Sequence, residues 1–144
     1  MATSEPSSPP VARDRRCVLI VEDNALNMKL FSAMIVAQGY DVLQATDGHG
    51  GLDLAHRQHP DLIIMDLQLP GISGLEVTSS LKADDDTRNI PIIATSAYVL
   101  RGDEERIMAS GCDGYIAKPI AISEFLGLVE MLIVRSRVAS GYAV

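Results

Sequence analysis

The sequence predicts an α/β protein in which five strand–helix units build one doubly wound parallel sheet. Three short apolar runs rich in β-branched residues, at 17–21, 61–65 and 90–95, are typical of strands buried on both faces of a sheet. A more mixed run at 41–46 has the character of an edge strand, and 114–118 is a shorter run of the buried kind. Because helix-forming segments separate these runs, right-handed crossovers are expected to place helices on both faces.

The segments between the runs carry the start and stop signals of helices. Gly39 and Gly111 follow two of them as C-terminal stops, and Pro60 ends a third. The last helix begins at Ser123, a residue type favoured as an N-cap. The predicted helices therefore span residues 24–38, 48–58, 74–83, 99–110 and 123–139.

Length and composition limit the class of protein. The chain has 144 residues, of which 47% are hydrophobic and only 4% aromatic, so we expect one domain with an aliphatic core. Twelve Lys and Arg against 19 Asp and Glu give a net charge of −7, which disfavours binding to nucleic acid or to an anionic membrane surface. No apolar run approaches the ~20 residues that cross a bilayer. Two cysteines form no disulfide framework, so a cytoplasmic protein is expected.

The two ends of the chain differ from the rest in composition. Residues 1–16 are rich in Ser and Pro and poor in apolar side chains, and are therefore predicted to be a disordered tail. Residues 17–139 form the predicted domain, and residues 140–144 a short C-terminal tail. Because this length leaves no room for a second, output domain, the readout is expected to be protein binding.

Acidic residues follow two of the buried runs at the points where the strands end. Glu22 and Asp23 come directly after the first run, and Asp66 after the third strand. Ligands of open parallel sheets bind at the carboxyl ends of the strands, so these carboxylates are expected to converge if the two strands are neighbours. Their mutual repulsion requires a cation, and a small set of oxygen ligands suits Mg²⁺. The alternative, that Glu22 and Asp23 only cap the helix near Asn24, does not account for Asp66 at the equivalent position of another strand.

The fourth and fifth strands bring a hydroxyl and an ammonium group to the same edge. Thr95-Ser96 ends one strand and Lys118-Pro119 the other, and an X-Pro bond permits a cis peptide that would aim the lysine. No His or Cys stands where it would act as a general base for acyl transfer. Carboxylates, a hydroxyl and an ammonium suit phosphoryl transfer, in which one carboxylate attacks in line and the cations neutralise charge on the phosphoryl oxygens.

Taken together and in order, these motifs resemble the receiver domain of two-component response regulators. The resemblance covers roughly residues 17–137 and is carried by Val21-Glu22-Asp23-Asn24, the stretch from Asp61 to Gly74, Ser96-Ala97, and Tyr115-Ile116-Ala117-Lys118-Pro119. It implies a flavodoxin-like sheet with strand order 2-1-3-4-5. It also implies a regulator that is not an enzyme on other substrates and catalyses only its own phosphorylation and slow dephosphorylation.

The resemblance assigns the phosphorylation and metal roles. Asp66 is the implied phospho-acceptor. Asp23 and Asp66 are implied to bind Mg²⁺ directly, together with the backbone carbonyl of Gln68, and Glu22 to reach it through water. Gln68 argues against an Mg²⁺-dependent phosphatase with an aspartyl nucleophile, because such enzymes need an acid two residues after the nucleophile. A flavin or nucleotide module would need a Gly-rich loop after the first strand, which is absent.

The resemblance also assigns a switch. Ser96 and Lys118 are implied to bind oxygens of the phosphoryl group, and Tyr115 to swing inward when Ser96 moves. Thr95, one residue earlier, is then expected to face the core. A degenerate receiver that acts only as a scaffold is the alternative, and the intact Asp66 and Lys118 argue against it.

The first predicted helix is more apolar than a single buried stripe requires. Met28 and Ile35 either face outward, as part of a partner surface, or lie in a helix that its neighbours cover more deeply. With Asn27, Phe31 and Pro119 they form the expected surface for a histidine kinase or a histidine phosphotransfer protein. The last helix is expected to pack into the core and to offer a homodimer contact in the phosphorylated state.

Overall fold

The fold alternates strands with helices, and the computed structural model describes residues 15–97 and 103–139. The strands are β1 (Cys17–Val21), β2 (Asp41–Ala45), β3 (Leu62–Asp66), β4 (Ile92–Ser96) and β5 (Gly114–Ala117). The helices are α1 (Ala25–Ala37), α2 (Gly48–Gln58), α3 (Gly74–Ala83), α4 (Asp103–Ala109) and α5 (Ile122–Ala139). All strand pairs are parallel, in the order β2-β1-β3-β4-β5, which confirms the predicted fold and the edge position of β2.

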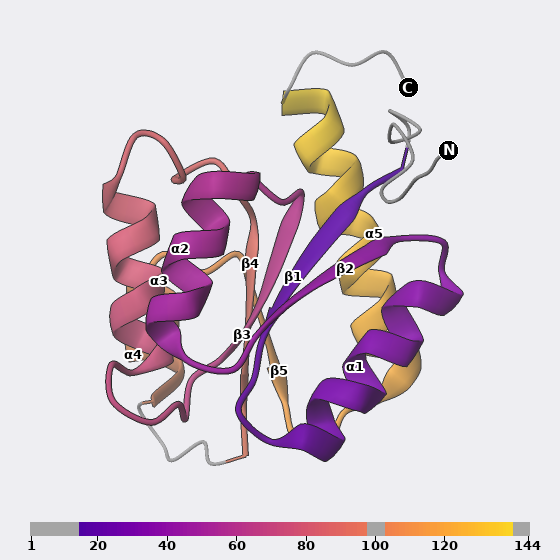
Figure 1. Cartoon of the computed structure of the whole chain (residues 1–144), viewed down its shortest axis with the longest axis horizontal. Helices are drawn as coiled ribbons and strands as arrows, with labels where there is room; N and C mark the ends of the chain where they lie inside the picture. Colours follow the sequence, from indigo (N-terminus) through magenta and orange to yellow (C-terminus); the bar gives the residue numbers. More distant parts are fainter. Residues whose placement is uncertain (1–14, 98–102, 140–144) are drawn as a thin grey trace, which may run out of the picture.

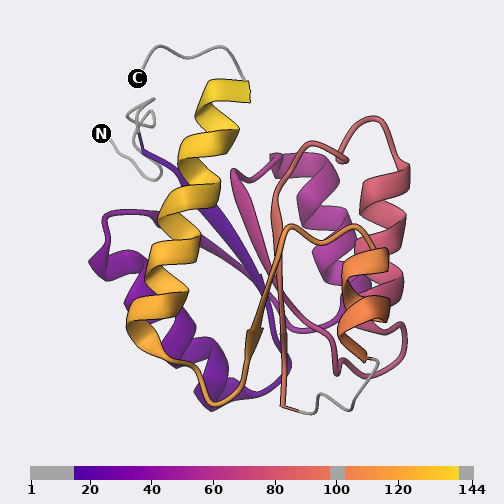
Figure 2. The ribbon, with the colours of Figure 1, turned by 180° about the vertical axis from the view of Figure 1, so that it is seen from behind.

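Helices cover both faces of the sheet. Helices α1 and α5 lie on one face, and α2, α3 and α4 on the other (Figures 1 and 2). Successive strand residues point to opposite faces, so each face has its own buried cluster. Ile20 and Ile64 pack with Phe125 of α5 on the first face, whereas Leu19 and Ile63 belong to the cluster on the second. Strands β1, β3 and β4 are therefore buried on both faces, as their apolar runs predict.

Strands β3 and β4 begin and end later than their apolar runs indicate. Strand β4 begins at Ile92 because the N–H of Ile90 donates to the carbonyl of Thr87 in the preceding turn (3.0 Å) and the next residue is a proline, which has no N–H. Both strands run one residue past their apolar runs and so end at the polar residues that the sequence places at the strand ends. Asp66 and Ser96 are therefore the last residues of their strands, and the sheet itself holds their backbones.

Helix α5 begins before its expected cap. Ser123 lies inside the first turn, because Ile122 is the first helical residue and the N–H of Phe125 donates to the carbonyl of Ala121 (2.9 Å). The prediction of an N-cap at Ser123 is therefore wrong. With 18 residues, α5 is long, yet neither it nor another helix in the described parts of the chain is long and apolar enough to cross a membrane. The expected start of the fourth helix at residue 99 lies outside the described residues.

The folded part of the chain begins before residue 17. Arg15 forms an ion pair with Asp41 at the start of β2 (2.6 Å). Arg16 is buried, its Nη1 lies 3.5 Å from Oδ1 of Asp61, and its carbonyl accepts the N–H of Asp41 (2.7 Å). These contacts attach both arginines to the sheet, although they belong to the range expected for the tail. Residues 1–14 and 140–144 lie outside the described residues.

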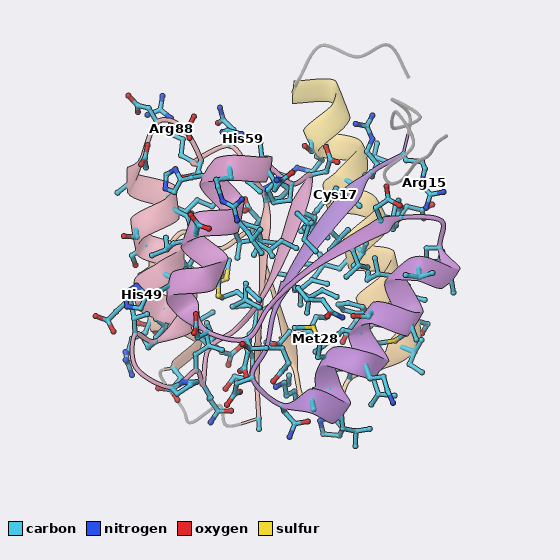
Figure 3. The ribbon with its side chains drawn as sticks, in the orientation of Figure 1. Arg15, Cys17, Met28, His49, His59 and Arg88 are labelled. Atoms are coloured by element: carbon cyan, nitrogen blue, oxygen red, sulfur yellow. The ribbon has the colours of Figure 1, made fainter. Side chains whose placement is uncertain are left out.

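Cys17, at the amino end of β1 (Figure 3), is expected to be a poor nucleophile. Burial raises the pKa of its thiol to about 11, and the charges of Asp61 and Asp41 act in the same direction. Alkylation of Cys17 by iodoacetamide, followed against pH by peptide mass mapping, should reach half its maximal rate near pH 11 in the folded protein. Because the unfolded thiol ionises first, the folding free energy contributed by the neutral thiol is lost as the pH rises from about 9 to 11. An alkylation midpoint near pH 9 in the folded protein would contradict the raised pKa of Cys17.

Candidate functional site

The parallel strands end at the lower edge of the sheet in Figure 1. Four of them are completed or followed there by a polar residue. Glu22 follows β1 directly and Lys118 follows β5, while Asp66 and Ser96 are the last residues of β3 and β4. Because all strands are parallel, these ends share one edge. The convergence that the sequence predicts is therefore present in the structure.

Three carboxylates meet at the ends of β1 and β3. Glu22, Asp23 and Asp66 each offer one oxygen, and these oxygens all lie within 4.8 Å of one another. Glu22 is 1% exposed and Asp66 3%, whereas Asp23 is exposed. Burial raises the pKa of Glu22 above its ordinary value, and the nearby Asp66 adds to the rise. Hydrogen bonds from the Lys118 ammonium and the Asn24 N–H oppose that shift.

Lys118 compensates part of this negative charge. Its Nζ donates to Oε1 of Glu22 (3.0 Å) and lies 3.6 Å from Oδ2 of Asp66. Its backbone N–H donates to the carbonyl of Ser96 (2.9 Å), and the peptide bond to Pro119 is cis. One ammonium faces three carboxylates, so the site's own charges favour a divalent cation held by oxygen ligands, and Mg²⁺ fits this donor set.

The N-cap of α1 is Asn24 and not one of the two acidic residues before it. The side chain of Asn24 accepts the N–H of Asn27 (2.9 Å) and is the N-cap of α1. Oε2 of Glu22 accepts the N–H of Asn24 (3.1 Å), which orients the carboxylate at the helix entrance. The alternative that the acidic pair serves only as a helix cap is therefore not supported, because Asn24 performs that role.

The loop after β3 is tied to both the Asp66 carboxylate and β4. The N–H of Gln68 donates to Oδ1 of Asp66 (2.9 Å), and Oε1 of Gln68 accepts the N–H of Ala97 (3.1 Å). The second contact was missed from the sequence, because a glutamine in a loop carries no signal for which distant backbone group it bonds. The Lys118–Glu22 ion pair was missed for the same reason, since it joins residues that are 96 positions apart.

Gly74 lets α3 start against the backbone of Asp66. A Cβ atom on Gly74 would lie 2.1 Å from the carbonyl oxygen of Asp66 and 2.7 Å from Cα of Leu67. A capping box between Ser73 and Glu76 fixes the same helix end. Helix α3 therefore contacts the loop after β3 directly, and only glycine allows this approach.

The hydroxyl-bearing residues are buried around the strand ends. Ser96 and Thr95 are both buried, and Oγ1 of Thr95 is enclosed with no hydrogen-bond partner among the described residues, which agrees with the expectation that Thr95 faces the core. Tyr115 packs against the cluster shared with α2, α3 and α4, and its hydroxyl oxygen is buried with no hydrogen-bond partner among the described residues. Burial raises the pKa of Tyr115, and the charges of Glu104 and Asp103 of α4 add to this effect.

The outward placement of Met28 and Ile35 is wrong. Their side chains are 7% and 0% exposed and form one stripe with Phe31, whose ring centroid lies 5.4 Å from that of Phe125. Met28 lies between α1 and the sheet in Figure 3. Residues spaced three and four apart share one helix face, and here that face packs on the sheet and α5. Met28 and Ile35 are therefore core residues and do not form part of a partner-binding surface.

A groove of about 690 Å³ lies beside Lys118 and contains the other three residues expected for partner binding. Its lining is formed by Asn27, Leu30, Phe31, Met34, Ala97, Lys118, Pro119, Ile120 and Ile122. Leu30 and Ile122 are 55% and 59% exposed, so the groove presents apolar side chains to solvent. Sequence reasoning missed Leu30, because the register of the mostly apolar α1 does not reveal which residues face out. It missed Ile122 because the last helix was expected to begin one residue later, at Ser123.

Comparison with known proteins identifies this combination of fold and site. A family model described as the response regulator receiver domain matches residues 18–130. The chain belongs to this receiver domain family. Over 115 residues the receiver is 52% identical to proteins named polar-differentiation response regulator DivK from Brucella ovis and Brucella melitensis, covering 80% of this chain and 94% of those relatives.

Solved receiver domains share the same architecture. The receiver domain of a sensor histidine kinase from Pseudomonas aeruginosa, solved with a magnesium ion coordinated in its active-site cleft, is 35% identical and has a TM-score of 0.77. The match covers 83% of this chain and 98% of that domain. A Francisella response regulator receiver domain is 26% identical with a TM-score of 0.79, over 85% of this chain and 99% of that domain.

Proposed function

We propose that this receiver takes a phosphoryl group from a phosphohistidine onto Asp66 and thereby changes the surface that it offers to partner proteins. The observation that carries this proposal is the placement of Asp66. Its buried carboxylate stands at the end of β3, 3.6 Å from Nζ of Lys118 and next to Glu22 and Asp23. Residues 17–139 are the proposed phosphorylated domain, in which the chain catalyses only its own phosphorylation and slow hydrolysis.

The chain's own groups account for the transfer. One carboxylate oxygen of Asp66 forms a bond to phosphorus as the bond from phosphorus to the donor's imidazole nitrogen breaks. The electron pair of the broken bond stays with the imidazole, and Asp66 becomes an acyl phosphate. The Lys118 ammonium is close enough to pair with a transferred oxygen, because it already lies 3.6 Å from Oδ2 of Asp66.

Mg²⁺ is the proposed cofactor of this site. Asp23 and Asp66 would bind it directly together with the backbone carbonyl of Gln68, and Glu22 would reach it through water. When bound, the ion supplies positive charge that neutralises phosphoryl oxygens. The charge balance supports this assignment. The single ammonium of Lys118 contacts Glu22 and Asp66, so three clustered carboxylates share one positive charge from that side chain.

Ser96, Lys118 and Tyr115 form the proposed switch. Phosphorylation adds negative charge and acceptor oxygens at Asp66, which draw in the Ser96 hydroxyl and compete with Glu22 for the Lys118 ammonium. The Tyr115 hydroxyl is buried with no hydrogen-bond partner among the described residues, and burying an unpaired hydroxyl is costly. Nothing described therefore holds this hydroxyl in place, and the side chain can move when Ser96 rearranges. Such a packing change is proposed to reach α4 and α5 and to favour a homodimer.

Partner proteins are proposed to dock on the groove beside Lys118. Asn27, Phe31 and Pro119 line it, and the exposed Leu30 and Ile122 would be covered by an apolar partner surface. A histidine kinase or a histidine phosphotransfer protein bound there would hold its phosphohistidine near the Asp66 site, because Lys118 borders both. Two free cysteines support a reducing, cytoplasmic location.

A Leu30→Glu variant is expected to separate docking from chemistry. A charge in the groove should slow phosphotransfer from a phosphorylated donor protein about tenfold, which corresponds to about 1.4 kcal/mol of lost binding. Labelling by acetyl phosphate should stay unchanged, because that small donor needs no groove. Val36→Glu is the matched control, since Val36 is an equally exposed residue of α1 that does not line the groove. Equal transfer rates in both variants would contradict the docking assignment.

Acetyl phosphate tests the phosphorylation itself. Incubation of the protein with this donor and Mg²⁺ should add the mass of one phosphoryl group, and chelation of the metal should prevent it. The added group should be lost in mild base, as an acyl phosphate is. A protein that stays unmodified with Mg²⁺ under all donor concentrations would support the alternative of a scaffold receiver.

A further inference from the structure

Gln68 makes two contacts that join separate parts of the site. Its backbone N–H donates to Oδ1 of Asp66 (2.9 Å), and its side-chain oxygen accepts the N–H of Ala97 (3.1 Å). Ala97 follows the last residue of β4, and β4 pairs with β3 in register at Asp66 and Thr95. One exposed side chain therefore links the loop after the acceptor strand to the end of the neighbouring strand.

The N–H of Ala97 is a donor at the edge of the phosphorylation site. It lies beside the loop that follows Asp66, and the preceding carbonyl of Ser96 accepts the N–H of Lys118 (2.9 Å), so its backbone is held near the charged groups. A phosphoryl group on Asp66 would place new, negatively charged acceptor oxygens in this region. Such oxygens form stronger hydrogen bonds than a neutral amide oxygen does.

We propose that the Gln68 side chain is a latch that occupies the N–H of Ala97 in the unphosphorylated protein and is displaced when Asp66 carries a phosphoryl group. This inference rests on the proposed phosphorylation of Asp66. The amide oxygen and the phosphoryl oxygens compete for one donor, so the latch holds the end of β4 in its unphosphorylated arrangement. Gln68 is thus a positioning residue of the switch, because it acts on the β4 end and not on the reacting atoms.

The strength of one exposed hydrogen bond sets the size of the effect. Such a bond changes an equilibrium by about two- to tenfold. A Gln68→Met variant keeps the length of the side chain but removes the acceptor, so it should open the latch. Gln68→Glu keeps an acceptor oxygen at the same reach and should preserve the contact. Both substitutions are at an exposed position and should leave the fold intact.

Amide hydrogen exchange of Ala97 tests the latch without phosphorylation or metal. Exchange should be about two- to tenfold faster in Gln68→Met than in the wild type, and should stay slow in Gln68→Glu. Gln58→Met, at the exposed end of α2, is the matched control and should leave Ala97 unaffected. Unchanged exchange of Ala97 in Gln68→Met would overturn the latch.

Beryllium fluoride with Mg²⁺, titrated into the full chain, tests the competition. Its apparent affinity should be about two- to tenfold tighter in Gln68→Met than in the wild type, because no amide oxygen has to be displaced. Equal or weaker affinity together with faster Ala97 exchange would overturn the competition. If the wild type binds no beryllium fluoride at all, the phosphorylation of Asp66 and the competition fail together, while the exchange measurement still decides whether the latch exists.

Discussion

An Asp66→Asn variant is expected to take up no phosphoryl group from acetyl phosphate or from a phosphorylated donor protein, while it keeps the native fold. A neutral amide is not a nucleophile toward phosphorus. The other two carboxylates of the site differ from Asp66, because Asp23 is exposed and Glu22 is bonded to Lys118 and Asn24. Asn has nearly the same shape as Asp, and its amide oxygen can still accept the N–H of Gln68. Removing one of three clustered negative charges also reduces repulsion on the buried Glu22, so the variant should be at least as stable as the wild type.

Intact-mass spectrometry measures this directly, beside a thermal unfolding curve for each protein. Asp53→Asn is the matched control, because Asp53 is an exposed residue of α2 that pairs with Arg57 (2.9 Å) and does not belong to the carboxylate cluster. The control should be phosphorylated as the wild type is. A phosphoryl adduct of wild-type yield on Asp66→Asn would assign the acceptor role to a different residue.

A Lys118→Met variant is expected to lose about 3 kcal/mol of folding free energy at neutral pH without Mg²⁺. Met has a similar length but no charge, so Glu22 would keep its burial and lose its ion pair (3.0 Å). The pKa of Glu22 is already raised by burial, and removing the ammonium raises it further. Because a protonated Glu22 needs no cation, the stability difference from the wild type should grow as the pH rises and shrink in acid.

Urea unfolding at several pH values measures this difference. Lys29→Met, an exposed lysine of α1, is the control and should change stability by less than about 0.5 kcal/mol. Added Mg²⁺ should restore part of the stability of Lys118→Met, because the metal neutralises the same carboxylates. A pH-independent loss that Mg²⁺ does not relieve would mean that Lys118 stabilises the fold by packing rather than by charge.

Most of the fold could be predicted because each element carries its own signal. The β-branched run at Cys17–Val21 and the position of Asp66 at a strand end follow from local sequence. Parallel strands then bring all carboxyl ends to one edge, so the carboxylate trio was predictable before any contact was known.

The remainder depends on geometry that local sequence does not carry. Helix α1 is apolar on several sides, so the sequence could not tell that Met28 and Ile35 face the sheet while Leu30 faces solvent. The Lys118–Glu22 ion pair and the Gln68–Ala97 hydrogen bond join segments that only the folded sheet brings together. Which groups meet in these two contacts depends on the distances between side chains in the folded site, and the spacing of the residues along the chain does not give those distances.

The most direct test of the central claim is to locate the phosphoryl group on the chain. Borohydride reduces an acyl phosphate of aspartate to homoserine, and peptide mass spectrometry then identifies the modified position. After transfer from acetyl phosphate or a phosphorylated histidine donor, we expect homoserine at residue 66 and at no other acidic position. Homoserine at Asp23 or another aspartate, or the one-carbon-longer hydroxynorvaline at Glu22 or another glutamate, with Asp66 unmodified, would contradict the proposed function.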